Sequence, residues 1–277
     1  MPLKDEFRDG PRLCPPPPDV SRNGGAPIER IIALGASNLT RGFHTLVSTA
    51  RAVWGPHVEV LAALGHGRSY GADSNFIVRG LPGILESDLW RAIGTLPPAP
   101  SRALITDIGN DIVYGFPASQ TLGWVEDAIS RLQRVTTDIV VTDLPLFTLR
   151  RLSPAKFLFF RSLFVPRCRM SLAEVVKEAE RINEGLEGLA AARGLRFVRL
   201  DPRWYGIDPI HMRVAAWHAA WQEILCGAVS PEIKKGPWTE GLRLYFMRPE
   251  RQSMFGVEQL SPQRGVPLKR GGRVWLF

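Results

Sequence analysis

Short runs of apolar residues alternate five times with longer segments in which apolar residues recur at helical spacing. Four consecutive apolar residues, as in 31–34, suit a central strand that is covered on both faces. Strands that alternate with helices in this way predict an α/β chain with a five-stranded parallel sheet in a three-layer α/β/α sandwich. The expected strands are 31–34, 57–64, 103–108, 138–144 and 195–200, and the expected helices are 39–54, 81–94, 118–135 and 171–193.

The carboxyl ends of these strands carry the residues of chemical interest. Right-handed crossovers bring all the strand ends to one edge of the sheet, where open α/β sheets bind their ligands. Gly35 permits a tight exit from the first strand, Ser37 follows it, and Asn38 can begin the next helix. Taken alone, such a serine and the glycine-rich loop 65–71 are ordinary turn features. Together with Asn110 and the segment after the fifth strand, they are expected to converge at one edge.

Composition limits the classes to which the chain can belong. Its 277 residues are 45% hydrophobic and 22% charged, which is typical of a globular protein. The net charge of +8 and the pI of about 9.9 favour attraction to anionic surfaces. Three widely spaced cysteines form no C-x-x-C pair, so we expect neither a disulfide framework nor a zinc site. No secretory signal and no membrane-spanning run is visible, which favours a cytoplasmic location.

The domain boundaries follow shifts in composition. Residues 1–27 are rich in proline and glycine and are expected to form a disordered or loosely attached leader. Residues 28–228 form the main domain, with an insertion at 146–170 that mixes five phenylalanines with six basic residues and no acidic one. The insertion is either a lid or an ordinary core element. Residues 229–277 form a basic extension packed on the main domain, with strand-like pieces at Leu242–Phe246 and Val274–Phe277.

A carboxylate and an imidazole occur three residues apart after the fifth strand, at Asp208 and His211. Asp208 can accept a hydrogen bond from one ring nitrogen and leave the other free as a base. An aspartate followed by a proline, here Pro209, is also the pattern of a helix N-cap with proline at the first position. The local sequence leaves both interpretations open.

The segments at the ends of the first two expected strands resemble blocks of the SGNH hydrolases, also called the GDSL esterase/lipase family. The whole resemblance covers roughly residues 29–227. The first block of that family, usually Gly-Asp-Ser, corresponds to Gly35-Ala36-Ser37. The second block supplies a glycine, here Gly67, with Gly65 as the second choice. Ala36 replaces the usual aspartate of the first block, and Ala62 stands where the second often has an asparagine.

The later segments resemble further blocks of the same family in the same order. Gly109-Asn110-Asp111 is similar to the third block, Gly-x-Asn-Asp, with one residue fewer between glycine and asparagine. Asp208-Pro209-Ile210-His211 matches the fifth block, Asp-x-x-His, in full. The resemblance implies an SGNH-type, flavodoxin-like arrangement of the five-stranded sheet.

The resemblance also implies a reaction. It implies Ser37 as a nucleophile that His211 activates as base, with Asp208 orienting the imidazole. The N–H groups of Ser37 and Gly67 and the side-chain amide of Asn110 would form the oxyanion hole. The implied function is hydrolysis of a carboxylic ester, either an acyl ester or an acetyl ester, through an acyl-serine. This chemistry requires no metal and no organic cofactor.

Other polar residues near the strand ends receive no chemical role from the sequence. Asp107, Asp111 and Asp143 are expected to be structural. The remaining histidines show no ligand spacing and are expected on the surface or in packing; they are His44, His57, His66 and His218.

The alternative function is that of a catalytically silent SGNH-fold protein that binds an anionic membrane surface or nucleic acid. The basic insertion 146–170 and the basic extension 229–277 suggest it, but no nucleic-acid-binding signature accompanies their charge. The expected partner is therefore a small-molecule ester, with no specific nucleic acid, no transmembrane segment and at most weak contact with a membrane surface. The oligomeric state stays open.

Overall fold

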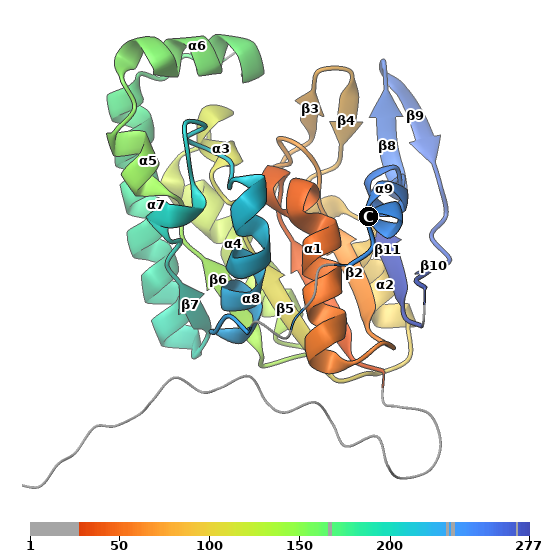
Figure 1. The fold of residues 1–277 in the computed structure, drawn as a ribbon. Helices are drawn as coiled ribbons and strands as arrows, with labels where there is room; N and C mark the ends of the chain where they lie inside the picture. The colour runs from red at the N-terminus through yellow and green to blue at the C-terminus, as the bar shows by residue number, and fades with distance from the viewer. Residues whose placement is uncertain (1–27, 166–167, 231–232, 234–235, 270) are drawn as a thin grey trace, which may run out of the picture.

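The computed structural model describes residues 28–165, 168–230, 233, 236–269 and 271–277. The expected leader, residues 1–27, lies outside the described residues. The main sheet has seven strands in the order β10-β11-β2-β1-β5-β6-β7, of which all but β10 run parallel (Figure 1). The strands are β1 (Arg30–Leu34), β2 (Glu59–Ala63), β5 (Ser101–Ile105), β6 (Ile139–Thr142), β7 (Arg196–Val198), β10 (Val266–Pro267) and β11 (Arg273–Leu276).

The five predicted strands are all present as β1, β2, β5, β6 and β7. Their spatial order is second, first, third, fourth, fifth, which is the flavodoxin-like order of a doubly wound sheet. The predicted number of five strands is wrong for the whole sheet, because the C-terminal segment adds β11 in parallel beside β2 and then β10. The expected strand at Val274–Phe277 is confirmed by β11, which spans Arg273–Leu276.

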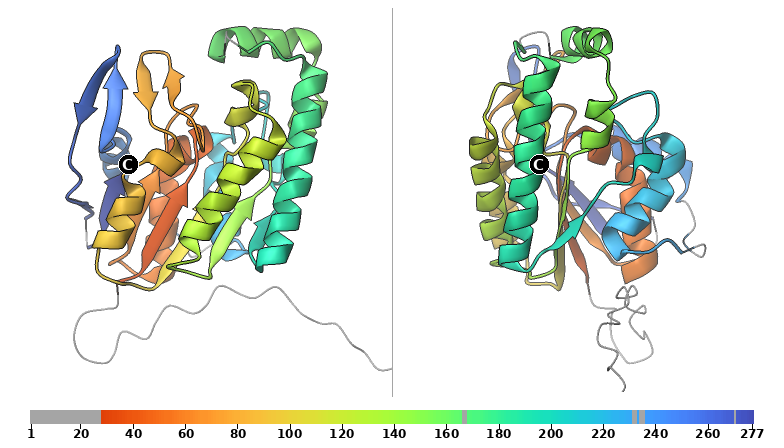
Figure 2. Two further views of the ribbon diagram at one scale, coloured as in Figure 1. Left: turned by 180° about the vertical axis from the view of Figure 1, so that it is seen from behind. Right: turned by 90° about the vertical axis from the view of Figure 1, so that its left-hand side faces the viewer.

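Helices cover both faces of this sheet, which makes three layers (Figure 2). One face is covered by α1 (Ser37–Trp54), α8 (Trp217–Cys226) and α9 (Trp238–Tyr245). The other is covered by α2 (Leu89–Thr95), α3 (Asn110–Val113), α4 (Ala118–Leu132) and α7 (Leu172–Arg193). Strand β1 lies between the two cores: Ile32 and Leu34 pack into one, and Ile31 and Ala33 into the other. This two-sided burial explains the unbroken apolar run of β1.

The helix α7 begins and ends where the sequence predicts. The Ser171 hydroxyl accepts a hydrogen bond from the N–H of Glu174, and the Glu174 carboxylate accepts one from the N–H of Ser171, which completes a capping box. Gly194 ends the helix in the left-handed conformation, with φ of 66°.

A second, four-stranded antiparallel sheet was not predicted. It consists of β3 (Ser74–Phe76), β4 (Arg79–Leu81), β8 (Arg251–Met254) and β9 (Val257–Leu260). The predicted helix at 81–94 is wrong in its first half, because residue 81 ends β4 and a 3₁₀ turn at Ile84–Glu86 precedes α2. The predicted strand at Leu242–Phe246 is also wrong, because most of it lies in α9.

The insertion forms two helices beyond the carboxyl edge of the main sheet, α5 (Leu146–Arg150) and α6 (Pro154–Phe164). Figure 1 shows α6 at the top of the molecule, on the side where the strands end. The Ser153 hydroxyl accepts a hydrogen bond from the N–H of Lys156, and Pro154 occupies the first turn of α6. Among the helices that the structure describes, none is long and apolar enough to cross a lipid bilayer.

Two glycines in helix interiors give a matched test of the packing between α1 and α8. A Cβ on Gly42 of α1 would lie 2.2 Å from Nε1 of the fully buried Trp221 on α8. A Cβ on Gly188 of α7 meets nothing within 4 Å. Gly188→Ala should raise the free energy of unfolding by about 1 kcal/mol through helix propensity. Gly42→Ala should lower it by about 1–3 kcal/mol through overpacking. Urea denaturation measures both, and a stabilised Gly42→Ala would contradict this close packing.

Candidate active site

Ser37 is the first residue of α1 and follows β1 after only two residues. A Cβ on Gly35 would lie 2.8 Å from the Thr106 methyl group, so the strand exit passes where only glycine fits. The helix begins at Ser37 and not at the predicted Asn38, and its N-cap residue is Ala36, which has no side chain that can cap. The first N–H groups of α1 therefore need an acceptor from elsewhere in the chain.

Asp107, which follows β5, supplies that acceptor. Its carboxylate accepts hydrogen bonds from the N–H groups of Ala36 at 3.0 Å and Leu39 at 2.9 Å. It also accepts one from the side-chain amide of Asn38 at 2.8 Å. Asp107 has φ of 58°, a left-handed conformation that aspartate tolerates better than most residues. The sequence assigned Asp107 a structural role, and the structure shows that this role is to hold the backbone on both sides of Ser37.

Asp208 and His211 form a hydrogen-bonded pair. Oδ2 of Asp208 lies 2.8 Å from Nδ1 of His211, which leaves Nε2 as the ring nitrogen that can serve as a base. Oδ1 of Asp208 accepts from the N–H groups of Ile210 at 3.0 Å and His211 at 3.1 Å. The N-cap interpretation is wrong, because residues 206–213 form no helix and α8 begins only at Trp217. Asp208 instead holds its own turn and the imidazole.

The Asp208 carboxyl is ionised over the whole pH range in which proteins are usually stable. Burial raises the pKa of Asp208, but the hydrogen bonds from the His211 ring and from the two backbone N–H groups outweigh burial and lower the pKa to about 2. Arg41 adds a cation 3.7 Å from Oδ2. A permanent carboxylate keeps a proton on Nδ1 of His211 and so fixes the tautomer of the ring.

Asn38 joins the serine to the histidine segment. Its amide nitrogen donates to the carbonyl of Ile210 at 3.1 Å, and its Oδ1 accepts from the N–H of Met212 at 2.8 Å. The two residues that flank His211 are thus bonded to the residue that follows Ser37. The sequence missed this positioning role, because it depends on contacts across more than 170 positions of the chain.

The glycine-rich loop after β2 brings Gly67 to the same place. Gly67 has φ of 66°, and its carbonyl accepts a hydrogen bond from the Tyr114 hydroxyl. Gly65 does not line the site, and a Cβ there would lie 2.1 Å from the Leu81 side chain. The amide of Asn110 donates to the carbonyl of Arg68 at 3.2 Å, which orients this side chain and leaves its second N–H for another acceptor.

Buried polar groups anchor the loop that carries Gly67. The Arg68 guanidinium is fully buried and donates to the carbonyls of Leu64 at 3.2 Å and Pro82 at 3.1 Å, and to that of Phe277. Burial, with the positive charges of nearby arginines, lowers the pKa of Arg68 to about 9.

Asp111 anchors the same loop from the other side. Its carboxylate accepts hydrogen bonds from the Ser69 hydroxyl and from the N–H of Tyr70. Burial raises the pKa of Asp111 to about 6, although both hydrogen bonds oppose this change. The loop is therefore fixed by its surroundings.

All the predicted site residues line one cavity of about 500 Å³. Residues that follow each of the five predicted strands contribute to it, as expected for the carboxyl edge of a parallel sheet. Its polar wall contains Ser37, Gly67, Asn110, Asp208 and His211. The rest is largely apolar and comes from α3, α7 and the insertion, including Ile112, Leu149, Leu152, Phe157 and Val175.

Two further basic side chains belong to the cavity wall. Arg41 and His66 both line the cavity. Burial lowers the pKa of His66, and the nearby positive charges of His211, Arg41 and Arg79 lower it further. The His66 ring lies 5.6 Å from that of Phe76, which is also part of the lining. From its sequence context His66 is expected only on the surface or in packing, because a single histidine in a glycine-rich loop has no partner nearby in sequence.

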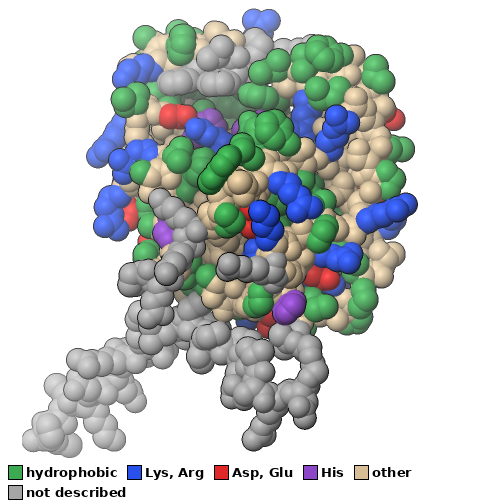
Figure 3. Space-filling model, turned by 45° about the vertical axis from the view of Figure 1, so that its right-hand side comes forward, with side chains coloured by type: hydrophobic (Ala, Val, Ile, Leu, Met, Phe, Trp, Pro, Cys, Tyr) green, Lys and Arg blue, Asp and Glu red, His purple; other side chains and the backbone are tan. Residues whose placement is uncertain are grey.

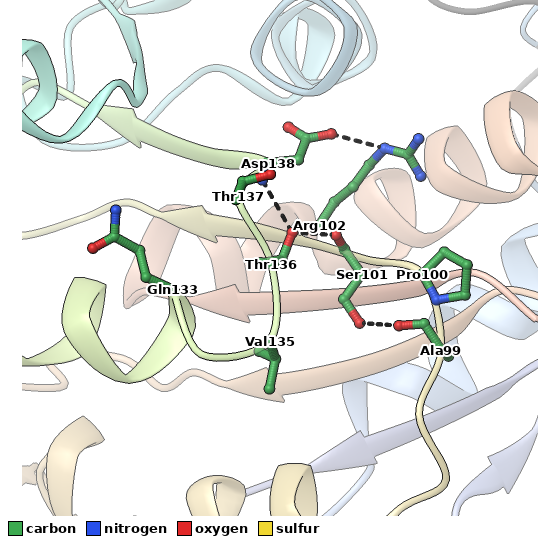
Figure 4. Close-up of a pocket in the computed structure, with 9 residues that line it drawn as sticks. All are labelled: Ala99, Pro100, Ser101, Arg102, Gln133, Val135, Thr136, Thr137 and Asp138. Carbon is green, nitrogen blue, oxygen red and sulfur yellow. Dashed lines mark hydrogen bonds and ion pairs between the residues drawn. The ribbon is translucent and has the colours of Figure 1, made fainter.

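A second hollow of similar volume lies at the opposite edge of the sheet, between the start of β5 and the turn before β6 (Figure 4). Its polar groups bond to one another: Arg102 pairs with Asp138 at 3.0 Å, and Thr136 donates to the carbonyl of Ser101. It contains none of the predicted site residues. Within the described part of the chain, no three His, Cys, Asp or Glu side chains are grouped as a metal site requires.

No protein-family model matches the chain, and no curated protein matches it either. Its fold is similar to several solved structures. One is the psychrotrophic esterase EstA from Pseudoalteromonas, with 12% identity over 70% of this chain and 93% of that chain and a TM-score of 0.45. Another is a member of the lipolytic G-D-S-L family from Veillonella parvula, with 12% identity over 71% of this chain and 94% of that chain and a TM-score of 0.46. A third is TesA (15% identity, 70% and 95%, 0.44).

Asp143, in the apolar part of the cavity, should make stability depend on pH. Burial raises its pKa to about 6, although the N–H of Leu200 donates to it at 2.7 Å. Because the ordinary pKa is 3.8, the unfolded state releases a proton between pH 4 and 6 that the folded state retains, and unfolding becomes easier as the pH rises. Asp143→Asn keeps an acceptor for Leu200 but does not titrate. The free energy of unfolding of the wild type should therefore fall, relative to the variant, from about pH 4 to 6. If the free energies of unfolding of the wild type and of Asp143→Asn change with pH in parallel, the pKa of Asp143 is not raised in the folded state.

Proposed function

We propose that the protein is a serine hydrolase that cleaves a carboxylic ester through an acyl-serine intermediate. One observation carries the proposal: a hydrogen-bonded carboxylate–imidazole pair and a helix-N-terminal serine line the same apolar cavity as two candidate oxyanion-hole residues. This is the combination of residues that acyl transfer requires.

In the proposed reaction, Oγ of Ser37 attacks the ester carbonyl carbon while Nε2 of His211 takes the hydroxyl proton. Asp208 holds the proton on Nδ1 and stabilises the imidazolium that forms. The imidazolium then returns its proton to the departing alcohol, and water attacks the acyl-serine with His211 again as base. No atom outside the chain, the ester and water is needed to balance these steps.

The oxyanion of the tetrahedral intermediate would be bound by the N–H groups of Ser37 and Gly67 and by the Asn110 amide. The geometry supports this role in two ways. Ser37 begins an 18-residue helix, whose N-terminus carries a partial positive charge. Asn110 and Gly67 are both fixed by hydrogen bonds, so little reorganisation is required when negative charge develops.

The apolar wall of the cavity supports an ester with an apolar acyl group. The insertion contributes Leu149, Leu152 and Phe157 to this wall, and Phe157 is only 6% exposed. In this proposal the insertion is a roof over the cavity, and it is also a core element, because Phe157 belongs to one of the two apolar cores. The catalytically silent alternative would leave the Asp208–His211 pair, the cavity and its apolar roof without a use.

Removing the nucleophile or the base should abolish turnover. Ser37→Ala and His211→Ala should each lower kcat by several orders of magnitude, because the two residues act as one unit. Asn110→Ala removes one oxyanion donor and should lower kcat by about 10²–10³-fold. Hydrolysis of p-nitrophenyl butyrate measures these effects, with thermal unfolding as the control for folding.

A fluorophosphonate probe tests the nucleophile directly. It should label the wild type at Ser37, as located by peptide mass spectrometry, and should leave Ser37→Ala unlabelled. Equal labelling of Ser37→Ala, or full esterase activity in that variant, would falsify the assignment.

The acyl pocket can be tested by filling it. Leu152→Trp should reduce kcat/KM for long acyl chains much more than for acetate or butyrate esters, because the added volume occupies the apolar end of the cavity. Leu158→Trp is the matched control, because Leu158 lies on α6 but is 48% exposed and does not line the cavity. A series of p-nitrophenyl esters of increasing chain length gives the comparison. An equal loss at every chain length would show that Leu152 affects the fold or the chemistry and does not limit an acyl site.

A further inference from the structure

Two neighbouring hairpin turns of the second sheet expose large apolar side chains. Ile77, in the turn between β3 and β4, is 85% exposed, and Phe255, in the turn between β8 and β9, is 78% exposed. Val78 and Val257 beside them are 38% and 65% exposed. These four residues are called the tip patch below.

The two turns form one continuous feature although they are far apart in the sequence. Strand β4 pairs with β8, with Arg79 opposite Met254, and the N–H of Phe255 donates to the carbonyl of Val78 at 2.8 Å. Figure 1 shows both hairpins pointing to the same end of the molecule, the end at which the strands of the main sheet finish.

The turns themselves favour other residues. Ile77 has φ of 59° and Phe255 has φ of 52°, both in the left-handed region that suits glycine or asparagine. A β-branched residue such as isoleucine is especially costly there. Phe255 and Gly256, with φ of 80°, stand where Asn-Gly is the usual pair. Bulky apolar residues held in unfavourable turn positions point to a function of their exposed side chains.

Exposed apolar residues also occur at other places around the cavity mouth. Phe76, which precedes the tip patch, lines the cavity from one side. On the other side α6 contributes Phe157 to the lining and exposes Leu158 by 48%. Ile207, next to Asp208, is 94% exposed. The upper edge of Figure 3 is the edge that carries the hairpin tips in Figure 1, and it shows hydrophobic side chains with Lys and Arg beside them.

The charge of the insertion has one sign, whereas the exposed Asp73 and Glu258 lie next to the two hairpins. The insertion contains no acidic residue, and it exposes Arg151, Lys156 and Arg169. Basic residues next to protruding apolar side chains are the combination that binds the surface of a membrane with anionic lipids. A bilayer accepts separate protruding side chains without a complementary shape, whereas a protein partner or a nucleic acid needs a matching surface or a basic groove.

We propose that the tip patch and the exposed side of α6 dock on the surface of a bilayer that contains anionic phospholipids. Docking buries the tip patch at the level of the headgroups and places the basic residues of the insertion against anionic lipid. The cavity mouth, between these two elements, then faces the bilayer. One further consequence rests on the proposed function: the ester that enters the cavity would be a lipid ester taken from the membrane.

Sedimentation with vesicles tests the docking without any measurement of catalysis. The wild type should bind vesicles of phosphatidylcholine mixed with phosphatidylglycerol, and bind pure phosphatidylcholine more weakly. The double variant Ile77→Gly/Phe255→Asn should lower the partition coefficient about tenfold or more, because two apolar side chains are removed from the buried surface. Both replacements suit the turns, so the variant should unfold at the same temperature as the wild type or a higher one.

Two further variants separate apolar from charge contributions. Trp238→Ser removes a side chain of similar exposure, 73%, from the start of α9 and should leave binding unchanged. Trp238 lies away from the cavity, because nearby Gly236 is beside Ser48 of α1. Ser48 is eleven residues, or about 16 Å, along that helix from Ser37. Arg151→Glu/Lys156→Glu should remove the preference for phosphatidylglycerol.

The outcomes distinguish this proposal from that of the hydrolase. Ser37→Ala should bind vesicles like the wild type, and Ile77→Gly/Phe255→Asn should hydrolyse p-nitrophenyl acetate normally. The docking proposal is overturned by wild-type protein that binds neither kind of vesicle, by undiminished binding of the tip variant, or by loss of binding in Trp238→Ser. Displacement from vesicles by single-stranded or duplex DNA at physiological salt would identify the basic surface as a nucleic-acid site and also overturn it.

Discussion

The candidate site depends on how the N-terminus of α1 is satisfied. The N-cap position is occupied by Ala36, which is completely buried and has no side chain that accepts hydrogen bonds. The carboxylate comes instead from Asp107 on the neighbouring strand exit, so β5 and α1 are fastened together at the base of the cavity. Asn38 is then free to bond to both neighbours of His211. A resemblance to a Gly-Asp-Ser block in which alanine replaces aspartate is thus compatible with an ordered serine, because another residue supplies an acceptor.

Five parallel strands of the main sheet, β1, β2, β5, β6 and β7, could be predicted because each carries its signal locally. A continuous apolar run marks a strand that is buried on both faces, and the order of such runs fixes which loops meet at the carboxyl edge. The second sheet has no such signal, since Ser74–Phe76 and Arg251–Met254 are short and mostly polar. In Leu242–Phe246 the alternation of Leu242, Leu244 and Phe246 suggested a strand. Tertiary packing decides otherwise, because Glu240 and Leu244, one helical turn apart, are both buried and Glu240 pairs with Arg51 at 3.2 Å.

The same distinction separates the site residues that were predicted from those that were missed. Ser37, Asn110 and His211 follow strands in the order of a known set of motifs, so their position and residue type suffice to nominate them. Asp107 and Asn38 act on partners that are more than 60 positions away, and nothing in their local sequence reveals the pairing. His66 is similar: only the folded chain places it beside Phe76 at the cavity mouth.

Stability and site geometry oppose each other at this edge of the sheet. Arg68, Asp111 and Asp143 are charged or titratable groups in buried positions, and burial shifts the pKa of each toward its neutral form. Such groups are unfavourable in a core, yet Arg68 and Asp111 hold the loop of Gly67 in place. The hairpin turns of Ile77 and Phe255 add backbone strain beside the same cavity. The large apolar cores on both faces of the sheet supply the stability that these features cost, and the carboxyl edge holds the candidate site residues in place. The insertion, which the sequence singled out, and the second sheet, which it did not reveal, both contribute residues to the wall of the cavity that Ser37 lines.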